Sequence, residues 1–267
     1  MESIFKSENI TEYGQIPFDK SLILNERLMP HEDIKSITVF LAPYFTGNTP
    51  DDNYGISAYA RVKDYHGYMK GLFERIIPKL EEKYQTKFYG FSDHSPLNEK
   101  LCAAMSGLGV IGNNSLLINK KYGSYVFIGI LLSSLSSKNY PQEIMRCMNC
   151  GYCESACLGY AIKNGIISQE KCLSAISQKK NINEDEKKLI SIHNVCWGCD
   201  KCQQVCPMNK NVQTTPIKYF EEHYLKNASP AIIEAMTDEE FNAYAFAWRK
   251  KQVILRNMHS IDSSKDQ

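Results

Sequence analysis

Two stretches of the chain, residues 147–157 (CMNCGYCESAC) and 196–207 (CWGCDKCQQVCP), determine how the molecule is organised. Each stretch holds four cysteines in the spacing C-x2-C-x2-C-x3-C. In this spacing three thiolates of one tight loop bind irons of a four-iron cluster, and the fourth cysteine binds the other cluster. Zinc is the nearest alternative, but a zinc site needs only four ligands and draws them from two separated pairs. The doubled run therefore predicts a ferredoxin-like module with two 4Fe-4S clusters.

The composition of the 267 residues is that of a globular protein, with 43% hydrophobic residues and a net charge of +1. The first residues, MESIFKSENITEYGQ, are polar and do not resemble a signal peptide. The longest apolar run, residues 125–132, is too short to span a bilayer. We therefore expect a cytoplasmic protein without a membrane partner, in a compartment where thiolates stay reduced. A net charge near zero indicates no general attraction to nucleic acid.

The sequence before the cysteine runs alternates between strand and helix patterns. The expected elements are a buried strand over residues 36–42, a helix over 64–84, a strand over 87–91, a helix over 97–106 and a hairpin of 115–119 with 125–132. After the cysteine runs the pattern is helical, with a capping box at Thr237 and Glu240 and a basic helix over 248–258. We expect an α+β fold with a mixed-sheet α/β body (1–137), a two-cluster module (138–215) and a helical tail (216–267).

Residues Gly107, Gly109 and Gly112 form a G-x-G-x-x-G motif. In a dinucleotide site this motif follows a strand and opens a helix, whereas here a helix is expected before it and a strand after it. The motif is therefore interpreted as a helix end and a tight turn. A backbone that must pass close to another flat ligand is the further alternative.

Several stretches, taken in order, resemble the epoxyqueuosine reductase family. They are residues 56–66 (ISAYARVKDYH), 93–99 (DHSPLNE), 107–118 (GLGVIGNNSLLI), the first cysteine run, 171–174 (KCLS), 198–207 (GCDKCQQVCP) and 255–257 (LRN). The resemblance implies that the body binds cobalamin. It also implies a reaction in which cobalamin and two 4Fe-4S clusters reduce the epoxide of epoxyqueuosine in tRNA to the alkene of queuosine. An external low-potential electron donor, such as a ferredoxin or flavodoxin, is implied as well.

The resemblance also implies roles for single residues. Asp93 matches the family's catalytic acid, which protonates the oxygen of the opened epoxide, and an apolar corrin face would raise its pKa enough to keep it protonated. From local sequence alone, a turn or N-cap role is favoured for Asp93, whereas the resemblance favours the acid. Five residues match positions that line the cobalamin: Asn113, Asn114, Ser115, Ile118 and Ser174. Asn113 departs from the family, which has lysine at this position.

The cysteine ligands divide into two sets, one of which stays ambiguous. The first cluster is expected on Cys147, Cys150, Cys153 and Cys206, and the second on Cys157, Cys199, Cys202 and one more cysteine. Ferredoxin spacing makes that fourth ligand Cys196. The family resemblance makes it Cys172, which we favour because the Cys-Leu-Ser segment aligns with the family without gaps.

The expected substrate is tRNA, although the family continues past the Leu-Arg-Asn segment into helical repeats that bind tRNA, and this sequence ends soon after it. Basic candidates for phosphate contacts are Lys120, Lys121, Arg249, Lys250 and Lys251. Two alternative functions remain. One is a two-cluster ferredoxin-type electron carrier, and the other is a cobalamin-dependent reductase of a small molecule, like the related reductive dehalogenases.

Overall fold

The structure is a computed structural model that describes residues 1–137 and 139–263. The expected start of the two-cluster module, Lys138, and the last four residues of the tail lie outside the described residues.

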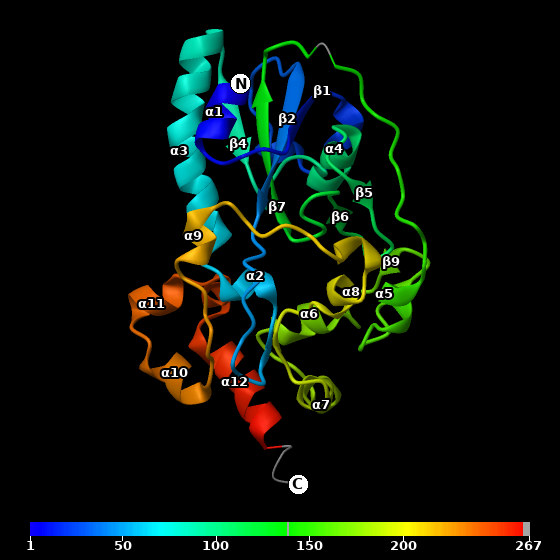
Figure 1. The fold of residues 1–267 in the computed structure, drawn as a ribbon, viewed down its shortest axis with the longest axis vertical. Coiled ribbons are helices and arrows are strands. Elements are labelled where there is room, and N and C mark those ends of the chain that lie inside the picture. The colour runs from blue at the N-terminus through cyan, green and yellow to red at the C-terminus, as the bar shows by residue number, and fades with distance from the viewer. Residues whose placement is uncertain (138, 264–267) are drawn as a thin grey trace.

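A four-stranded antiparallel sheet forms the centre of the body (Figure 1). Its strands run in the order β1 (Tyr13–Pro17), β2 (Ser36–Pro43), β7 (Val126–Ser133) and β4 (Phe88–Phe91). β2 is buried along its whole length and pairs with β7 from Ser36↔Ser133 to Pro43↔Val126. A strand buried on both faces reads as a continuous apolar run, which is the pattern that predicted β2.

Helices cover both faces of this sheet. The long α3 (Tyr65–Tyr84) and the short α1 (Glu2–Ser7) lie on one face, and α4 (Glu99–Met105) lies on the other. Asp64 caps α3 by accepting the amide of His66, and Gln85 ends the helix in the left-handed conformation. The 3-10 helices Lys20–Leu22 and Glu26–Leu28 and the short α2 (Ala58–Arg61) lie in the connections between these elements. The predicted helices over 64–84 and 97–106 and the strand over 87–91 are confirmed.

The predicted hairpin of residues 115–119 with 125–132 is wrong. Strand β6 (Leu117–Ile118) pairs with β5 (Val110–Ile111), while β7 pairs with β2 and β4. Gly109 explains this pairing, because a Cβ atom there would lie 2.6 Å from the carbonyl oxygen of Ile118. The glycine motif therefore forms the end of α4, where Gly107 has φ +77, followed by the turn that was expected.

The cysteine module is built from short elements. They are α5 (Tyr152–Ser155), β8 (Ile162–Lys163), β9 (Ile166–Ile167), α6 (Leu173–Ser177), α7 (Glu184–Ile192), β10 (Val195–Trp197), α8 (Lys201–Gln204) and the 3-10 helix Pro207–Asn209. β10 pairs in parallel with β3 (Gly55–Ile56) from the body. The fold thus combines an antiparallel main sheet with a parallel pair that joins the body to the module.

The tail is helical, as predicted. It contains α9 (Lys218–Glu221), α10 (Pro230–Ala235), α11 (Asp238–Asn242), the 3-10 helix Ala245–Arg249 and α12 (Lys251–Asp262). The capping box of Thr237 and Glu240 begins α11 and is confirmed. The expected helix over 248–258 begins later, at Lys251, because Lys250 has φ +65 and separates it from the preceding 3-10 helix.

Two of the three hydrophobic cores among the described residues join these parts. One core joins Ile56 and Ala60 to β10, α6, α7 and α12, and a second joins the α3 face of the sheet to Ile217 and Phe220 of the tail. Both cores therefore cross the boundaries expected after residues 137 and 215. The division into three domains stays a prediction.

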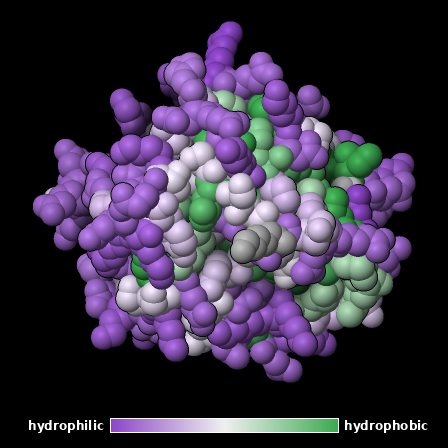
Figure 2. Space-filling view, turned by 90° about the horizontal axis from the view of Figure 1, so that it is seen from above, coloured by the Kyte–Doolittle hydropathy of each residue, from purple (hydrophilic) through white to green (hydrophobic). Residues whose placement is uncertain are grey.

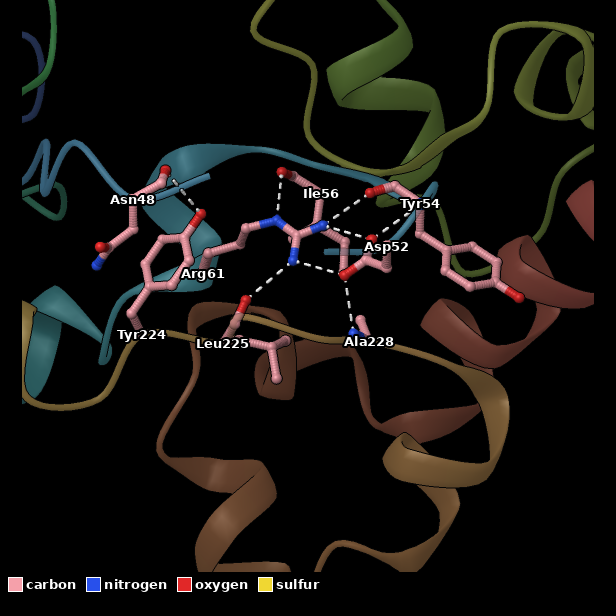
Figure 3. A network of polar contacts seen from close by, with 8 residues as sticks. All are labelled: Asn48, Asp52, Tyr54, Ile56, Arg61, Tyr224, Leu225 and Ala228. Carbon is pink, nitrogen blue, oxygen red and sulfur yellow. Dashed lines mark hydrogen bonds and ion pairs between the residues drawn. The ribbon is translucent and has the colours of Figure 1, made fainter. Parts of the chain in front are cut away.

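A buried ion pair ties the body to the tail (Figure 3). Arg61 is 2% exposed and contacts the Asp52 carboxylate, which is 5% exposed. The guanidinium donates two hydrogen bonds to Asp52 and three to the backbone carbonyls of Tyr54, Ile56 and Leu225. Asp52 in turn accepts the amide of Ala228 at 2.8 Å. The network thereby fixes the loop before β3 against the segment between α9 and α10.

The surface at the α1 and β1 end of the molecule is mainly hydrophilic, with hydrophobic side chains scattered over it (Figure 2). Within the described ranges, no helix has both the length and the apolar character needed to cross a membrane.

Candidate functional site

A cavity of about 590 Å³ opens between the sheet, the cysteine module and the tail. Its lining residues are Tyr59, Tyr65, His66, Ser92, Asp93, Glu99, Val126, Phe127, Ile128, Gln178, Ala245 and Trp248. The last five residues of the central strand β7 are buried, but its first three, Val126 to Ile128, are only half-buried. An apolar stretch of a central strand is therefore left uncovered at this cavity, which is where a large ligand could lie.

Asp93 lies in the turn between β4 and α4, in the left-handed conformation with φ +65. Its Oδ2 is 3.4 Å from Nε2 of His66, and Nδ1 of the same ring is 2.9 Å from Oδ1 of Asp64. Tyr65, which stacks on Phe127 at 4.2 Å, also hydrogen-bonds to Asp93. The beginning of α3 thus supplies the polar partners of Asp93.

These contacts set the charges of the pair. Hydrogen bonds to Asp64, and then to Asp93, raise the pKa of His66 to about 9. The hydrogen bond from His66 lowers the pKa of Asp93, against the opposing effect of burial. This direction is opposite to the one expected for a carboxyl group beneath an apolar face, because the imidazolium is its nearest charge. At neutral pH the two side chains form a carboxylate–imidazolium pair that holds one proton.

Glu99, the first residue of α4, enters the same cavity. Burial, and then the charge of Asp93, raise the pKa of Glu99 to about 7. Its Oε1 is buried and has no hydrogen-bond partner in the described part of the chain. Neither Glu99 nor His66 was expected at the site from the sequence, although both lie in the stretches that resemble the family. Glu99 shares the stretch 93–99 with Asp93, but His66 lies in the separate stretch 56–66, so no signal in the sequence indicated that the three side chains meet.

The first set of predicted cluster ligands comes together beside the β5–β6 turn. Cys147, Cys150, Cys153 and Cys206 line one small cavity. Burial raises the pKa of the Cys153 and Cys206 thiols, and the charges of Cys147 and Cys150 raise both further, as expected for neighbouring thiolates. Cys150 is exposed, so this set lies near the surface.

The second set comes together between α5, α6 and α8. Burial, and then Asp200, Cys172 and Cys157, raise the pKa of Cys199. Burial, and then Cys199, Asp200 and Cys172, raise the pKa of Cys202 to about 12. These contacts group Cys172 with the other three cysteines expected at the second cluster.

Cys196 lies apart from this set. It is fully buried, and its Sγ lies 3.7 Å from the carbonyl oxygen of Ile254 in α12. The charged groups that influence its pKa are Arg61, Asp52 and Asp262. The choice of Cys172 over Cys196 stays a prediction. In the described residues, no group of three His, Cys, Asp or Glu side chains is arranged to hold a single metal ion.

The residues expected to line the cobalamin lie away from Asp93. Asn113, Asn114 and Ile118 line the cavity of the first cysteine set, and Asn113 hydrogen-bonds to Asn149 at 2.5 Å. Ser115 has φ +57, and its hydroxyl donates to the carbonyl oxygen of Gly165. Ser174 lies on α6, one turn before Gln178 of the large cavity, and its carbonyl oxygen accepts the amide of that glutamine. Of the predicted site residues, Asp93 alone lines the large cavity.

Comparisons with known proteins agree with the resemblance. Residues 26–94 match the family described as "Epoxyqueuosine reductase QueG, DUF1730", and residues 146–209 match the "4Fe-4S double cluster binding domain". The fold is similar to the epoxyqueuosine reductase of Streptococcus thermophilus, with a TM-score of 0.81 at 22% identity over 100% of this chain and 80% of that one. It is also similar to an epoxyqueuosine reductase solved with a tRNA-Tyr epoxyqueuosine-modified stem loop, with a TM-score of 0.78 at 23% identity over 97% and 80% of the two chains.

Curated relatives fall into two groups by length. The chain spans about half the length of the epoxyqueuosine reductase of Staphylococcus aureus, at 29% identity over 73% of this chain and 53% of that one. Longer matches are found with the epoxyqueuosine reductases of Cyclobacterium marinum, at 32% identity over 89% and 80% of the two chains, and of Cellulophaga algicola, at 31% over 86% and 76%. Because these two relatives exceed 30% identity over most of their length, the chain belongs to the epoxyqueuosine reductase family.

Proposed function

We propose that this protein is an oxidoreductase that reduces the epoxide of epoxyqueuosine in tRNA to the alkene of queuosine, with cobalamin and two 4Fe-4S clusters as cofactors. The observation that carries this proposal is the large cavity. It combines a hydrogen-bonded acid, Asp93, with an uncovered apolar strand surface. An electron carrier without a substrate would need no such cavity.

The lining of the cavity fits cobalamin. Val126, Phe127 and Ile128 offer a half-buried apolar surface of the kind that a large planar ligand covers. When bound there, cobalamin would supply a strongly reducing centre for cleavage of a carbon–oxygen bond. The two sets of cysteines would hold the clusters that pass electrons singly to this centre.

The chain's own residues would bind the substrate and move protons. An epoxide oxygen leaves as an alkoxide unless an acid protonates it. His66 is the proton store for Asp93, since its imidazolium lies 3.4 Å from the Asp93 carboxylate. Tyr65 is fixed by stacking on Phe127 and forms a hydrogen bond to Asp93. The pair is therefore oriented before the substrate binds.

The rim of the cavity carries a feature suited to RNA. Trp248 is 60% exposed, and the guanidinium of Arg249 lies 3.8 Å from the centre of its ring. Single-stranded bases stack on exposed aromatic rings and on guanidinium planes. Lys121 and Lys251 donate hydrogen bonds within the chain. Arg249 donates one through Nε to the carbonyl oxygen of Gln178, which fixes its guanidinium beside the Trp248 ring. We therefore place the tRNA loop against Trp248 and Arg249.

An external low-potential carrier, such as a ferredoxin or flavodoxin, would supply the electrons. A groove beside Cys157 is lined by Lys171, His193 and Lys201, and by apolar residues that include Leu158. Positive charge next to the second cysteine set would attract an acidic carrier. This proposal predicts that electron transfer to the clusters slows as salt concentration rises.

The test is anaerobic reconstitution with iron, sulfide and cob(II)alamin. Cobalt EPR would report cobalamin binding, and nucleoside mass spectrometry would report conversion of an epoxyqueuosine-containing stem loop. We expect a protein-induced change in the cobalt signal and formation of queuosine, with Asp93→Asn retaining the clusters and losing conversion. A cobalt spectrum identical to that of free cobalamin would refute the proposal. Cobalamin binding without conversion of the stem loop would refute the tRNA substrate alone.

A further inference from the structure

We propose that Glu99 is a second proton-donating residue of this site and supplies one of the two protons that epoxide removal consumes. The inference rests on the proposed function and concerns a side chain to which no role has been given so far.

The chemistry requires two protons. Removing the epoxide oxygen breaks two carbon–oxygen bonds and forms the second bond of the alkene. The oxygen leaves as water, so the overall reaction takes up two electrons and two protons. The electrons come one at a time from the external one-electron carrier. One acid that is not recharged within a turnover therefore supplies only half of the protons.

The pair of Asp93 and His66 holds one of these protons. Nε2 of His66 lies 3.4 Å from Oδ2 of Asp93, and Asp64 holds the opposite edge of the ring at 2.9 Å. Both side chains are about half-exposed, at 65% for Asp93 and 54% for His66, so the pair can be recharged from solvent. It has no second proton to give at neutral pH, since the carboxylate is already ionised.

Glu99 is the other proton store in the cavity. It lies at the far end of the turn that begins with Asp93, and it lines the same cavity. Its Oε1 is buried without a hydrogen-bond partner among the described residues. Burying a carboxylate oxygen without a hydrogen-bond donor costs free energy. Burying a neutral, protonated carboxyl group at the same position costs much less. The buried, unpartnered Oε1 thus favours the neutral acid on a residue that lines the cavity.

The charges around Glu99 also favour its neutral form. Burial raises the pKa of Glu99 most, and the negative charge of Asp93 raises it next. Three groups lower this pKa but have the smaller effect: the Asp93 amide, the Ser95 hydroxyl and Lys100. The amino group of Lys100 donates to the carbonyl oxygen of Ser115. The thiol of Cys102, on the same helix, has a raised pKa and is neutral. From α3, the negative Asp64 and the positive His66 face the turn as a pair. With a pKa of about 7, Glu99 can both release and regain a proton at neutral pH.

A purely structural role for Glu99 is the competing explanation. Its carboxylate accepts the backbone amide of Asp93 and could serve only to shape the turn. Glutamine has the same size and keeps an acceptor oxygen for that amide. Glu99→Gln therefore separates the two roles, because it preserves the acceptor and removes the proton.

The experiment compares wild-type holoenzyme with Glu99→Gln, Glu99→Asp and the control Glu74→Gln, whose side chain is exposed on α3. Single-turnover conversion of the epoxyqueuosine stem loop is measured against pH. Infrared difference spectra of the same samples record the carbonyl band of a protonated carboxyl group. We expect the wild-type rate to fall as pH rises through about 7. The single-turnover rate of Glu99→Gln should be lower by ~10²-fold or more and should not fall as pH rises through about 7. Glu99→Asp should recover part of the rate.

The infrared band should titrate near pH 7 in the wild type and in Glu74→Gln, and be absent in Glu99→Gln. A Glu99→Gln rate within about threefold of wild type, with an unchanged pH profile, would overturn the inference, since the general-acid effect it tests is far larger. Persistence of the band in Glu99→Gln would overturn it as well. A wild-type enzyme that converts no stem loop would instead refute the proposed function, and the role of Glu99 would be refuted together with it.

Discussion

Replacing Arg61 by lysine tests whether the buried network of Figure 3 holds the body and the tail together. Lysine keeps the positive charge beside Asp52 but has one amino group in place of the planar fork. It cannot reach the carbonyl oxygens of Tyr54, Ile56 and Leu225 at once, and these accept hydrogen bonds of 2.8, 3.2 and 2.9 Å from the guanidinium. At least two of the three carbonyls would therefore lose their donor.

The cost follows from burial. A buried acceptor left without a donor costs ~1–3 kcal/mol, so two such carbonyls correspond to about 2–6 kcal/mol for Arg61→Lys. Arg61→Met would in addition leave the charge of Asp52 unpaired at 5% exposure, which adds ~3–5 kcal/mol. Since whole domains are stable by only ~5–15 kcal/mol, we expect Arg61→Met not to yield folded protein.

The assay is anaerobic urea unfolding followed by far-UV circular dichroism, with the slope of the transition compared between variants. Arg75→Lys is the matched control, because Arg75 is half-exposed and lysine keeps a positive charge beside Glu8, whose side chain is 13% exposed. A pair whose cation is solvated in this way contributes ~0–1 kcal/mol, so the control should unfold close to the wild type. The reasoning is refuted if Arg61→Lys loses no more stability than Arg75→Lys.

Three further predictions concern other parts of the molecule. Cys172→Ser should lose the iron of one cluster, while Cys196→Ser should keep the iron of both; equal iron content in the two variants would contradict the grouping. The imidazole of His66 should titrate by NMR near pH 9, above its ordinary value of 6.5. The pairing of His66 then contributes stability that is fully present below pH 6.5 and is lost as pH rises through about 9. An imidazole that titrates near pH 6.5 would exclude the pair. Gly129→Ala should lower the melting temperature, because its Cβ would lie 2.2 Å from the ring of Phe40; overpacking of this kind costs ~1–3 kcal/mol, and an unchanged melting temperature would show that the ring can move aside.

Strong local patterns predicted most of the secondary structure. β2 was predictable because both of its faces are buried, and α3 because its apolar residues recur with helical spacing. β1 was missed since its sequence, YGQIP, holds a glycine and a proline and pairs on one side only, as edge strands do. The hairpin was misassigned because pairing depends on which backbones can approach, and Gly109 allows β5 to reach β6.

The candidate site was predictable only in part. Asp93 was identified from the family resemblance, but its partners depend on how the start of α3 meets the β4–α4 turn, which no spacing reveals. His66 and Glu99 were missed for this reason. Spacing also left two candidates for the eighth cluster ligand. Tertiary packing favours Cys172, because Cys196 lies against α12 and the charge of Cys172 acts on Cys199, and the choice stays a prediction.

The packing of α12 has a consequence for the order in which the protein matures. Asn257 on this helix is fully buried and donates to the carbonyl oxygens of Ser177 and Cys196, both at 2.8 Å. The helix closes the core beneath the second cysteine set, yet it follows every cysteine of both runs in the sequence. The loops that would receive iron are therefore supported only after α12 has been synthesised. Metal loading then follows the synthesis of α12, and a nascent chain released before Asn257 would expose its thiols to oxidation.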